Sequence, residues 1–259
     1  MSYEQKKYIK EIKMNKLLIL FCQIFIFILF VLLWQLLSDK KIVNSFITSS
    51  PLRIIKTIVK LYRNDNLLMH IIITLKECLT AFFITLTISL IIATIMYNNI
   101  FIAKVIEPYL IMLNSLPKVA LGPLIIIWIG ANQKAIIFMG ILISVIVSVQ
   151  NIYTGFISTD KLKIKLLKTF KANKYEILFN VVIPYNKETI LNTLKINLSM
   201  CLIGVIMGEF LTSKKGIGYL ILYGSQVFNL DIVMSGIFLL VIISTLLYLI
   251  INIIIKIFE

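Results

Sequence analysis

The sequence predicts an all-α integral membrane protein built as a bundle of six membrane-spanning helices. Apolar residues make up 59% of the 259 residues and the mean hydropathy is +0.98, whereas soluble globular chains are roughly half apolar. A bilayer core about 30 Å thick requires roughly 20 helical residues, because unpaired backbone amides in hydrocarbon are costly. Six apolar stretches meet that length: 17–37, 70–97, 105–129, 135–152, 189–211 and 232–255.

The charge balance agrees with a membrane setting. The chain carries 26 Lys and Arg against 12 Asp and Glu, a net charge of +14, which is typical of proteins that meet nucleic acid or an anionic membrane surface. Only Arg53 and Arg63 are arginines, whereas recognition of bases and phosphates favours the bidentate guanidinium. We therefore expect membrane lipid as a partner and no nucleic acid. Cys22, Cys78 and Cys201 lie in apolar runs, where burial keeps thiols inert, so they predict neither disulfides nor a metal site.

Residues 1–16 form a basic tail, and 17–37 form the first predicted span. The apolar run is too long for a signal peptide and no small-residue cleavage site follows it, so we expect the helix to remain. Cytoplasmic loops are enriched in Lys and Arg. Counted over alternate loops, one face holds 14 of them (five in the tail, seven in 153–188, and Lys104 and Lys256), and the other face holds nine. This bias places both termini and segment 153–188 in the cytoplasm.

Segment 38–69 is predicted to lie outside and to contain a basic amphipathic helix. Positive residues recur three and four apart opposite an apolar stripe: Arg53, Lys56, Lys60 and Arg63 against Leu52, Ile55, Val59 and Tyr62. Ser50 suits the N-cap and Pro51 the first helical position. The helix either lies along the outer interface or packs on the bundle as an ordinary loop helix.

The third span carries prolines and polar residues together. The prolines are Pro108, Pro117 and Pro123. Proline removes a backbone hydrogen-bond donor. A membrane helix with several such breaks is tolerated only where it lies beside protein or a water-filled cavity. A lysine inside a span is costly unless it snorkels or faces water. The segment is therefore either a pathway wall, with Asn114, Ser115 and Lys118 as candidate lining residues, or a kinked packing helix.

Other polar groups fall within the second and fifth spans. Lys76 and Glu77, and Lys195 and Glu209, are candidates for lining or pairing, and we add Glu77 and Glu209 to the pathway candidates. Gly204 and Gly208 form a Gly-x-x-x-Gly pair, which serves either close approach of another helix or internal packing. His70, the single histidine, lies at a span boundary and is expected to be structural.

Segment 153–188 alternates lysines with apolar residues and predicts two short amphipathic helices. Asp160 can cap the first helix, Asn173 and Glu176 match the capping-box pattern of the second, and Pro184 is expected to end it. The segment presents a basic, structured surface. It is either a docking element for a cytoplasmic partner or a helix pair lying on anionic headgroups.

The sequence lacks the motifs of several enzyme classes. It contains no G-x-x-x-x-G-K-[ST] loop and no H-E-x-x-H pair, which bind nucleotide phosphates and zinc respectively. We therefore assign no catalytic, cofactor-binding or metal-binding residue. If nucleotide powers transport, it must bind another chain.

Three stretches carry a family resemblance. They are Thr48–Phe82, Leu116–Gly130 (LPKVALGPLIIIWIG) and Gly204–Ile221 (GVIMGEFLTSKKGIGYLI). Read in order, they resemble the six-helix permeases of bacterial ATP-binding-cassette importers, in the branch that handles nitrate, sulfonates, taurine and some vitamin precursors. The last stretch is similar to the family pattern of an acidic residue before a Gly-Leu-Gly-Tyr-like turn, here with Gly216 and Gly218. The resemblance implies the type I importer permease fold, with 70–255 as the core and 256–259 as a cytoplasmic end.

The resemblance also identifies 153–188 as the coupling loop that such permeases insert into a groove of the ATPase. The family signature there is Glu-Ala-Ala, then Gly, then Ile-x-Leu-Pro. The matching positions are Lys165, Leu166 and Leu167, then Lys171 at the glycine with Ala172, Asn173 and Tyr175 after it, and finally Val181, Val182, Ile183 and Pro184. Glycine enters a left-handed turn freely, whereas lysine does so at a cost of about 1 kcal/mol. We therefore expect a turn of different shape at Lys171.

By this resemblance the chain is the permease subunit of an ATP-driven importer in the bacterial plasma membrane. An external binding protein would deliver a small solute of the sulfonate, taurine, nitrate or vitamin-precursor class. The implied partners are a second copy of the permease, two ATP-binding subunits that hold ATP and Mg, and the extracytoplasmic binding protein. One alternative is an ion-coupled secondary transporter, expected to show internal repeats and midplane carboxylates. Others are an intramembrane enzyme, expected to show a metal cluster or nucleophile–base pair, and a permease homologue with weakened ATPase coupling.

Overall fold

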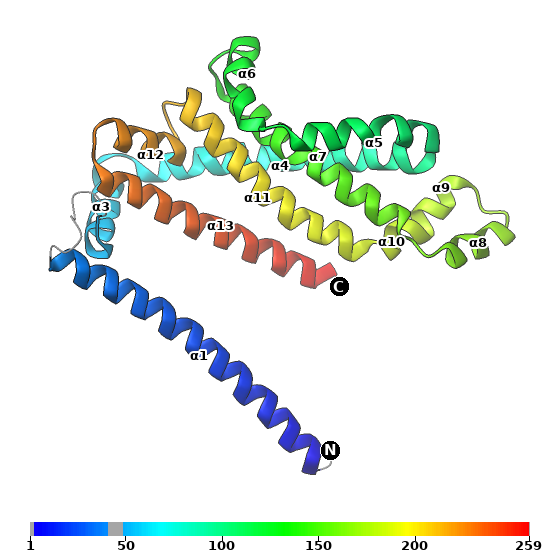
Figure 1. The fold of residues 1–259 in the computed structure, drawn as a ribbon, viewed down its shortest axis with the longest axis horizontal. Coiled ribbons are helices and arrows are strands. Elements are labelled where there is room, and N and C mark those ends of the chain that lie inside the picture. Colours follow the sequence, from blue (N-terminus) through cyan, green and yellow to red (C-terminus); the bar gives the residue numbers. More distant parts are fainter. Residues whose placement is uncertain (1–2, 41–48, 259) are drawn as a thin grey trace. The chain divides into compact units, whose positions relative to one another are not determined.

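The structure is a computed structural model that describes residues 3–40 and 49–258, so residues 41–48 of the predicted external segment lie outside the described residues. Within the described part all regular structure is helical (Figure 1). Five helices are long and apolar enough to cross a membrane, and the number reaches six if one strongly bent pair is a single span. This confirms the predicted all-α membrane fold. The chain forms two compact units, Met1–Asp65 with Gly224–Ser235, and Asn66–Tyr223 with Gly236–Glu259.

The first unit begins with α1 (Tyr3–Asp39). The helix runs without a break through the predicted basic tail and the first span. Its apolar part, Leu17–Asp39, has a mean hydropathy of 3.0 over its most apolar window, and none of the described side chains of that window is buried. The apolar surface of α1 is therefore not used in packing within its own unit.

The amphipathic helix α3 (Pro51–Asn64) forms where the sequence predicts it. Ser50 is its N-cap, with its hydroxyl accepting a 3.4 Å hydrogen bond from the Arg53 N–H, and Pro51 occupies the first position. Ile54 and Leu61 are buried. The predicted apolar stripe is instead exposed: Leu52, Ile55, Val59 and Tyr62. Packing within the unit thus uses a face beside the stripe.

An ion pair fixes the start of α3. The Arg53 guanidinium Nη2 lies 2.6 Å from Asp231 Oδ2, and the Ser49 hydroxyl donates a 2.6 Å hydrogen bond to Asp231 Oδ1. Asp231 lies in the first turn of α13 (Leu230–Phe258). One carboxylate therefore joins two segments that are far apart in the sequence.

Three long helices form the centre of the second unit: α4 (Leu67–Asn98), α7 (Gln133–Ile157) and α11 (Lys187–Thr212). Helix α7 packs against both α4 and α11. A Cβ on Gly204 would lie 2.6 Å from the Cα of Gly140, and one on Gly208 would lie 2.8 Å from the Cα of Ile136. The Gly-x-x-x-Gly pair therefore serves internal packing of α11 on α7.

The third predicted span is broken into two helical pieces. Helix α5 (Ile100–Ser115) contains Pro108, and after Leu116 and Pro117 a short 3₁₀ turn leads into α6 (Gly122–Ile129). The pieces meet at 88°. The expected interruption is present, and it is a sharp bend at Pro117, where the chain leaves helical geometry altogether.

Segment 153–188 contains the two predicted short helices and a helical continuation. They are α8 (Lys161–Thr169), α9 (Lys174–Ile177), the π-helical η2 (Leu178–Val182) and α10 (Ile183–Tyr185). Asp160 caps α8, and Asn173 and Glu176 form a capping box on α9, which confirms both capping predictions. The prediction that Pro184 ends the second helix is wrong. Helical structure continues through Pro184 to Tyr185, because a π-helical segment precedes the proline.

The last two helices are α12 (Ile217–Gln226) and α13. Within the second unit, α13 buries one stripe at four-residue spacing: Leu239, Ile243, Leu247, Ile251 and Ile255. Only 17% of its most apolar window is buried. The remaining faces of α13 are apolar and are not covered within the second unit.

Candidate functional site

Glu209 is buried on α11 and holds the turn that precedes α12. Its Oε1 accepts a 2.7 Å hydrogen bond from the Thr74 hydroxyl, and its Oε2 accepts a 2.6 Å hydrogen bond from the Gly218 backbone N–H. The Ile217 N–H donates to Thr74 Oγ1 at 2.9 Å. One carboxylate thus joins α4, α11 and the start of α12.

This arrangement requires both glycines of the turn. Gly216 has a φ of +107°, in the left-handed region that favours glycine. A Cβ on Gly216 would collide with the Glu209 carboxyl group, and a Cβ on Gly218 would lie 2.8 Å from the Glu209 Cβ. The sequence pattern named all three residues, but their mutual contact emerges only in the folded chain.

His70 supports the same turn from α4. Its Nδ1 accepts a 3.0 Å hydrogen bond from the Gly216 N–H, and its ring stacks on Tyr219 with centroids 6.0 Å apart. These contacts agree with the structural role expected for this histidine.

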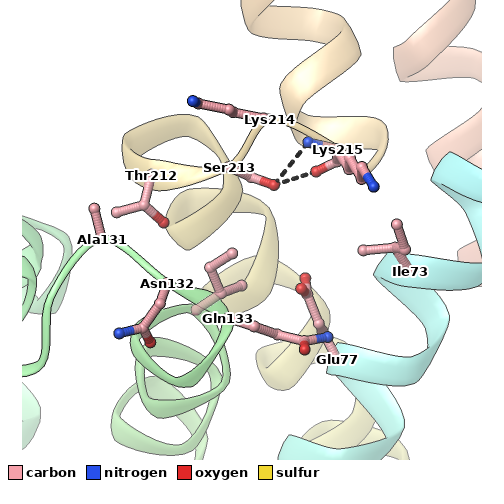
Figure 2. Close-up of a pocket in the computed structure, with 10 residues that line it drawn as sticks. Ile73, Glu77, Ala131, Asn132, Gln133, Thr212, Ser213, Lys214 and Lys215 are labelled. Atoms are coloured by element: carbon pink, nitrogen blue, oxygen red, sulfur yellow. Dashed lines mark hydrogen bonds between the residues drawn. The ribbon is translucent and has the colours of Figure 1, made fainter.

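A pocket of about 550 Å³ opens beside this turn, between the ends of α4, α7 and α11 (Figure 2). Its volume falls in the range of small-molecule sites. The polar residues that shape it are Glu77, Asn132, Gln133, Thr212, Ser213, Lys214 and Lys215. Among the predicted pathway residues, Glu77 is the one that lines it.

Three of these polar groups are already engaged within the protein. The Thr212 hydroxyl donates a 3.2 Å hydrogen bond to the Gly208 carbonyl. Asn132 caps α7, with its Oδ1 accepting hydrogen bonds from the N–H groups of Lys134 at 2.9 Å and Ala135 at 3.3 Å. The Ser213 hydroxyl accepts a 3.0 Å hydrogen bond from the Lys215 N–H. The remaining polar groups of the lining are those of Glu77, Gln133 and the two lysine ammonium ions.

Glu77 lines the pocket from α4 and is 2% exposed. Its carboxyl group lies within hydrogen-bonding reach of Gln133 and of Glu209. Its Oε2 atom is buried and has no hydrogen-bond partner among the described residues. Such an atom costs free energy unless a ligand or water pairs with it.

A second polar pocket, of about 410 Å³, lies at the other end of α7 and α11. Its lining is rich in amide and hydroxyl groups from Asn151, Thr154, Ser158, Thr189, Asn192 and Thr193. No sequence motif marks these residues, because uncharged polar residues scattered through an apolar helix have no characteristic spacing. Only the apposition of the two helices gathers them.

A buried polar cluster lies between α4, α7 and α11. The hydroxyl groups of Thr85 and Ser144 are 2.9 Å apart, and the Cys201 thiol lies 3.2 Å from Ser144 Oγ and 3.3 Å from Asn197 Oδ1. Because each of these groups has a partner, the cluster joins the three helices rather than offering a ligand site.

The pathway candidates of the third span lie apart from both polar pockets. Lys118 Nζ donates a 3.0 Å hydrogen bond to Asn114 Oδ1, and the Ser115 hydroxyl donates to the Ile111 carbonyl at 3.1 Å. Asn114 and Ser115 are exposed at the bend, and none of the three lines either polar pocket. The structure groups Glu77 with Glu209 and leaves these three together at a separate place.

The two lysines proposed as lining groups also stay outside these pockets. Lys76 is exposed on α4. The Lys195 ammonium lies 5.7 Å from the centre of the Tyr248 ring, a cation–π contact.

The loop segment is anchored to the bundle by its own apolar residues. Ile177, Leu178 and Val182 are buried against Ile152 and Phe156 of α7. Large apolar side chains of the segment are exposed, among them Leu162, Leu166, Phe170, Tyr175 and Phe179. A fixed base with an exposed apolar surface is typical of a docking element.

The turn between α8 and α9 has a left-handed residue at Lys171, with a φ of +60°. The Ala172 N–H donates to the Leu167 carbonyl at 3.1 Å and the Lys171 N–H to the Lys168 carbonyl at 3.0 Å, the bonding pattern of a Schellman motif. We expected a different shape because lysine replaces glycine. The structure instead keeps the glycine-type turn with lysine in the left-handed position.

Comparison with known proteins gives a family and several relatives. The family model described as "Binding-protein-dependent transport system inner membrane component" matches residues 85–259. A "Probable ABC transporter permease protein" of Haemophilus influenzae is 27% identical over 84% of this chain and 88% of its own length. The formylaminopyrimidine transport permease protein ThiX of Halalkalibacterium halodurans is 23% identical over 74% of this chain and 76% of its own. The taurine transport system permease protein TauC of Escherichia coli is 20% identical over 83% and 80%.

Two solved structures share the fold. A bacterial ABC transporter involved in import of the acidic polysaccharide alginate has a chain that aligns with a TM-score of 0.65 and 16% identity, over 96% of this chain and 98% of that one. The MetNI methionine ABC transporter has one with a TM-score of 0.58 and 15% identity, over 71% and 90%. At these identities the likeness shows the fold alone.

Proposed function

Because this chain belongs to the family of binding-protein-dependent transport system inner membrane components and is a permease subunit of an ATP-binding-cassette importer, we propose how it assembles and what it carries. Two copies enclose the pathway, two ATP-binding subunits dock on residues 160–183, and an external binding protein delivers the solute. ATP and Mg bind to the docked subunits, where hydrolysis takes place.

One observation carries the proposal: the pocket at Glu77 and the loop segment 153–188 lie at opposite ends of the same two helices. Helix α7 starts with Gln133 at the pocket and leads into the loop, and α11 leaves the loop and ends with Thr212 at the pocket. With 25 and 26 residues, each helix is close to 40 Å long at about 1.5 Å per residue. A force applied to the loop is therefore delivered through two rigid helices to the pocket.

The solute class follows from the relatives. These relatives are named as permeases for taurine, aliphatic sulfonates and formylaminopyrimidine, which are small polar molecules. We propose that this chain carries a solute of that size and polarity. The pocket of about 550 Å³ and the second polar pocket at the other helix end suit such a solute.

The loop segment faces the cytoplasm in this proposal, and both termini lie on the same side of the bacterial plasma membrane. The excess of lysines in the tail and in 153–188 supports that orientation. Single cysteines placed at Lys171 and Lys214 test it with a membrane-impermeant thiol reagent on intact cells. Labelling at position 214 and protection at 171 are expected, and the reverse pattern contradicts the orientation.

Docking is tested by co-purification with a cognate ATP-binding subunit that is co-expressed with this chain. Leu166 and Phe170 are 57% and 77% exposed on the loop, so replacing both by alanine removes apolar docking surface without opening the core. The L166A/F170A variant is expected to lose the ATPase, whereas the matched variant I253A, on exposed α13 surface, keeps it. If L166A/F170A retains the ATPase as I253A does, the loop is not the docking element.

A further inference from the structure

We propose that a groove between α11 and α13 holds one acyl chain of an anionic phospholipid, with the lipid phosphate against Lys195 and Tyr248. The groove shares no lining residue with the two polar pockets described above. The lipid is a ligand that the permease keeps bound, and it is not the transported solute.

The groove is an open, mostly apolar pocket of about 410 Å³. Both of its walls belong to the second unit of the chain. Seven of its nine lining residues are apolar, and the other two are Ser244 and Thr245. Ile203 on one wall and Val241 on the other are 48% and 58% exposed. A site of this kind suits a hydrocarbon chain, which gains by leaving contact with polar groups and needs no hydrogen bonds.

The two walls of the groove lead to Lys195 and Tyr248. On α11, Lys195 precedes the lining residue Leu202 by seven residues, and on α13, Tyr248 follows Val241 by seven. Residues seven apart share one face of a helix. The Lys195 ammonium lies 5.7 Å from the centre of the Tyr248 ring, so the two walls meet there. Ser244 and Thr245, the polar part of the lining, lie toward this same end.

Lys195 lies in a membrane-spanning helix without an acid to pair with it. Among the described residues its ammonium has no ion-pair or hydrogen-bond partner, and the Tyr248 hydroxyl has no hydrogen-bond partner. The acid of α13, Asp231, pairs with Arg53 at the other end of that helix. Glu188 of α11 lies seven residues before Lys195, about 10 Å along the helix. A lysine in a span is costly unless it is paired, and its ammonium has three donors to offer a phosphate.

The length of the groove matches the depth of one lipid leaflet. Tyr248 lies eleven residues from Ile237, the lining residue at the far end, which is about 16 Å at about 1.5 Å per residue. Half of a bilayer core of about 30 Å is about 15 Å. An acyl chain whose phosphate contacts Lys195 therefore fills the groove to its end.

The charge at the end of the groove selects the occupant. A helix of a second copy would cover the apolar walls but would bring no anion to Lys195. An anionic phospholipid supplies both parts, because its chain fills the groove and its phosphate accepts from the ammonium and the Tyr248 hydroxyl. Basic pockets between membrane helices bind anionic headgroups in this way, and lysine and tyrosine are typical anchors at that level of the membrane.

The test measures lipid binding to the full chain in detergent by native mass spectrometry. The probes are dioleoylphosphatidylglycerol, dioleoylglycerol, which has the same chains without the phosphate, and glycerol phosphate, which has no chains. We expect the phospholipid to bind at least about tenfold more tightly than dioleoylglycerol, because of the charge-assisted hydrogen bonds to its phosphate. Glycerol phosphate in large excess is expected not to displace the phospholipid.

Two variants separate the headgroup contact from the groove. K195Q is expected to weaken the phospholipid about tenfold and to leave dioleoylglycerol unchanged. Its control is K76Q, at an exposed lysine within the span of α4. V241W fills the groove and is expected to weaken both lipids about tenfold, because displacing two methylenes from an apolar site already has that effect. Its control is I91W, at a position of α4 that is 54% exposed. Both controls are expected to bind as the unmodified chain does.

Equal binding of the phospholipid and dioleoylglycerol to the unmodified chain would overturn the phosphate contact. Phospholipid binding that survives both K195Q and V241W, or that is displaced by glycerol phosphate, would overturn the site. The variant V241C adds a test in the native membrane. If oxidation joins V241C chains into a disulfide-linked dimer that the unmodified chain does not form, a second copy covers the groove and the lipid assignment is wrong.

Discussion

The backbone N–H of Gly218 donates a 2.6 Å hydrogen bond to Oε2 of Glu209. The donor belongs to the first turn of α12, where N–H groups have no partner within the helix, and the acceptor is a buried carboxylate on α11. Thr74 completes the arrangement from α4. The connection between two membrane helices is thus tied down by a side chain from the bundle, beside the pocket proposed to hold solute.

The substitution T74V should destabilise the protein. Valine keeps the shape of threonine but leaves Glu209 Oε1 and the Ile217 N–H without their buried partner, which costs about 1–3 kcal/mol. Thermal unfolding of the detergent-solubilised chain, followed by size-exclusion chromatography, measures the change. The matched variant T87V, on exposed surface of the same helix where the hydroxyl bonds only to the Phe83 carbonyl, should be nearly neutral. Equal effects at 74 and 87 would show that the cluster contributes nothing to stability.

The substitution G216A should be more damaging than its size suggests. The left-handed φ of +107° penalises any side chain by about 1–2 kcal/mol, and the new Cβ would displace the Glu209 carboxyl group. We expect a lower melting temperature and loss of the α11–α12 turn. The neighbouring change K215A, at an exposed position, is the control for stability. If the G216A and K215A variants have the same melting temperature, the close contact between Gly216 and the Glu209 carboxyl group does not contribute to stability.

The substitution G204V should separate α11 from α7. Its side chain would enter space held by the Cα of Gly140 and the carbonyl of Met139, at 2.6 and 2.7 Å from the added Cβ. Overpacking of this kind costs about 1–3 kcal/mol, and here it also shifts the two helices that connect the loop to the pocket. Ile203 is 48% exposed on the same turn, so I203V is the control. The measurement is the formation of a disulfide cross-link between cysteines placed on α7 and α11. Equal cross-linking in the G204V and I203V variants would refute the prediction.

The substitution K171G should stabilise the loop. Glycine removes the strain of a left-handed lysine, a gain of about 1 kcal/mol, and a firmer turn should raise stimulation of the partner ATPase. The substitution K165G, in the interior of α8, should instead destabilise the loop, because glycine weakens a helix by about 1 kcal/mol. Melting curves and ATPase assays in proteoliposomes measure both. A K171G variant that behaves like K165G would show that lysine is not strained at this turn.

The sequence determined the features that depend on local chemistry or on composition. Hydropathy located the spans because the bilayer imposes a minimum length on every apolar helix. The caps at Ser50, Asp160 and Asn173 were predictable because each bonds to a backbone N–H two or three residues away. The break near Pro117 was also predictable, because proline lacks the backbone N–H that continues a helix.

Tertiary structure alone decided which polar groups meet. Thr74 and Glu209 are 135 residues apart, and no periodicity in the sequence links them, so the acidic candidates could be named but not paired. The sequence equally could not separate Glu77, which lines a pocket, from Asn114 and Lys118, which bond to each other at the bend. The physical reason is that helix packing, set by small residues such as Gly204 and Gly140, selects which faces approach, and the position of every buried polar group follows from that choice.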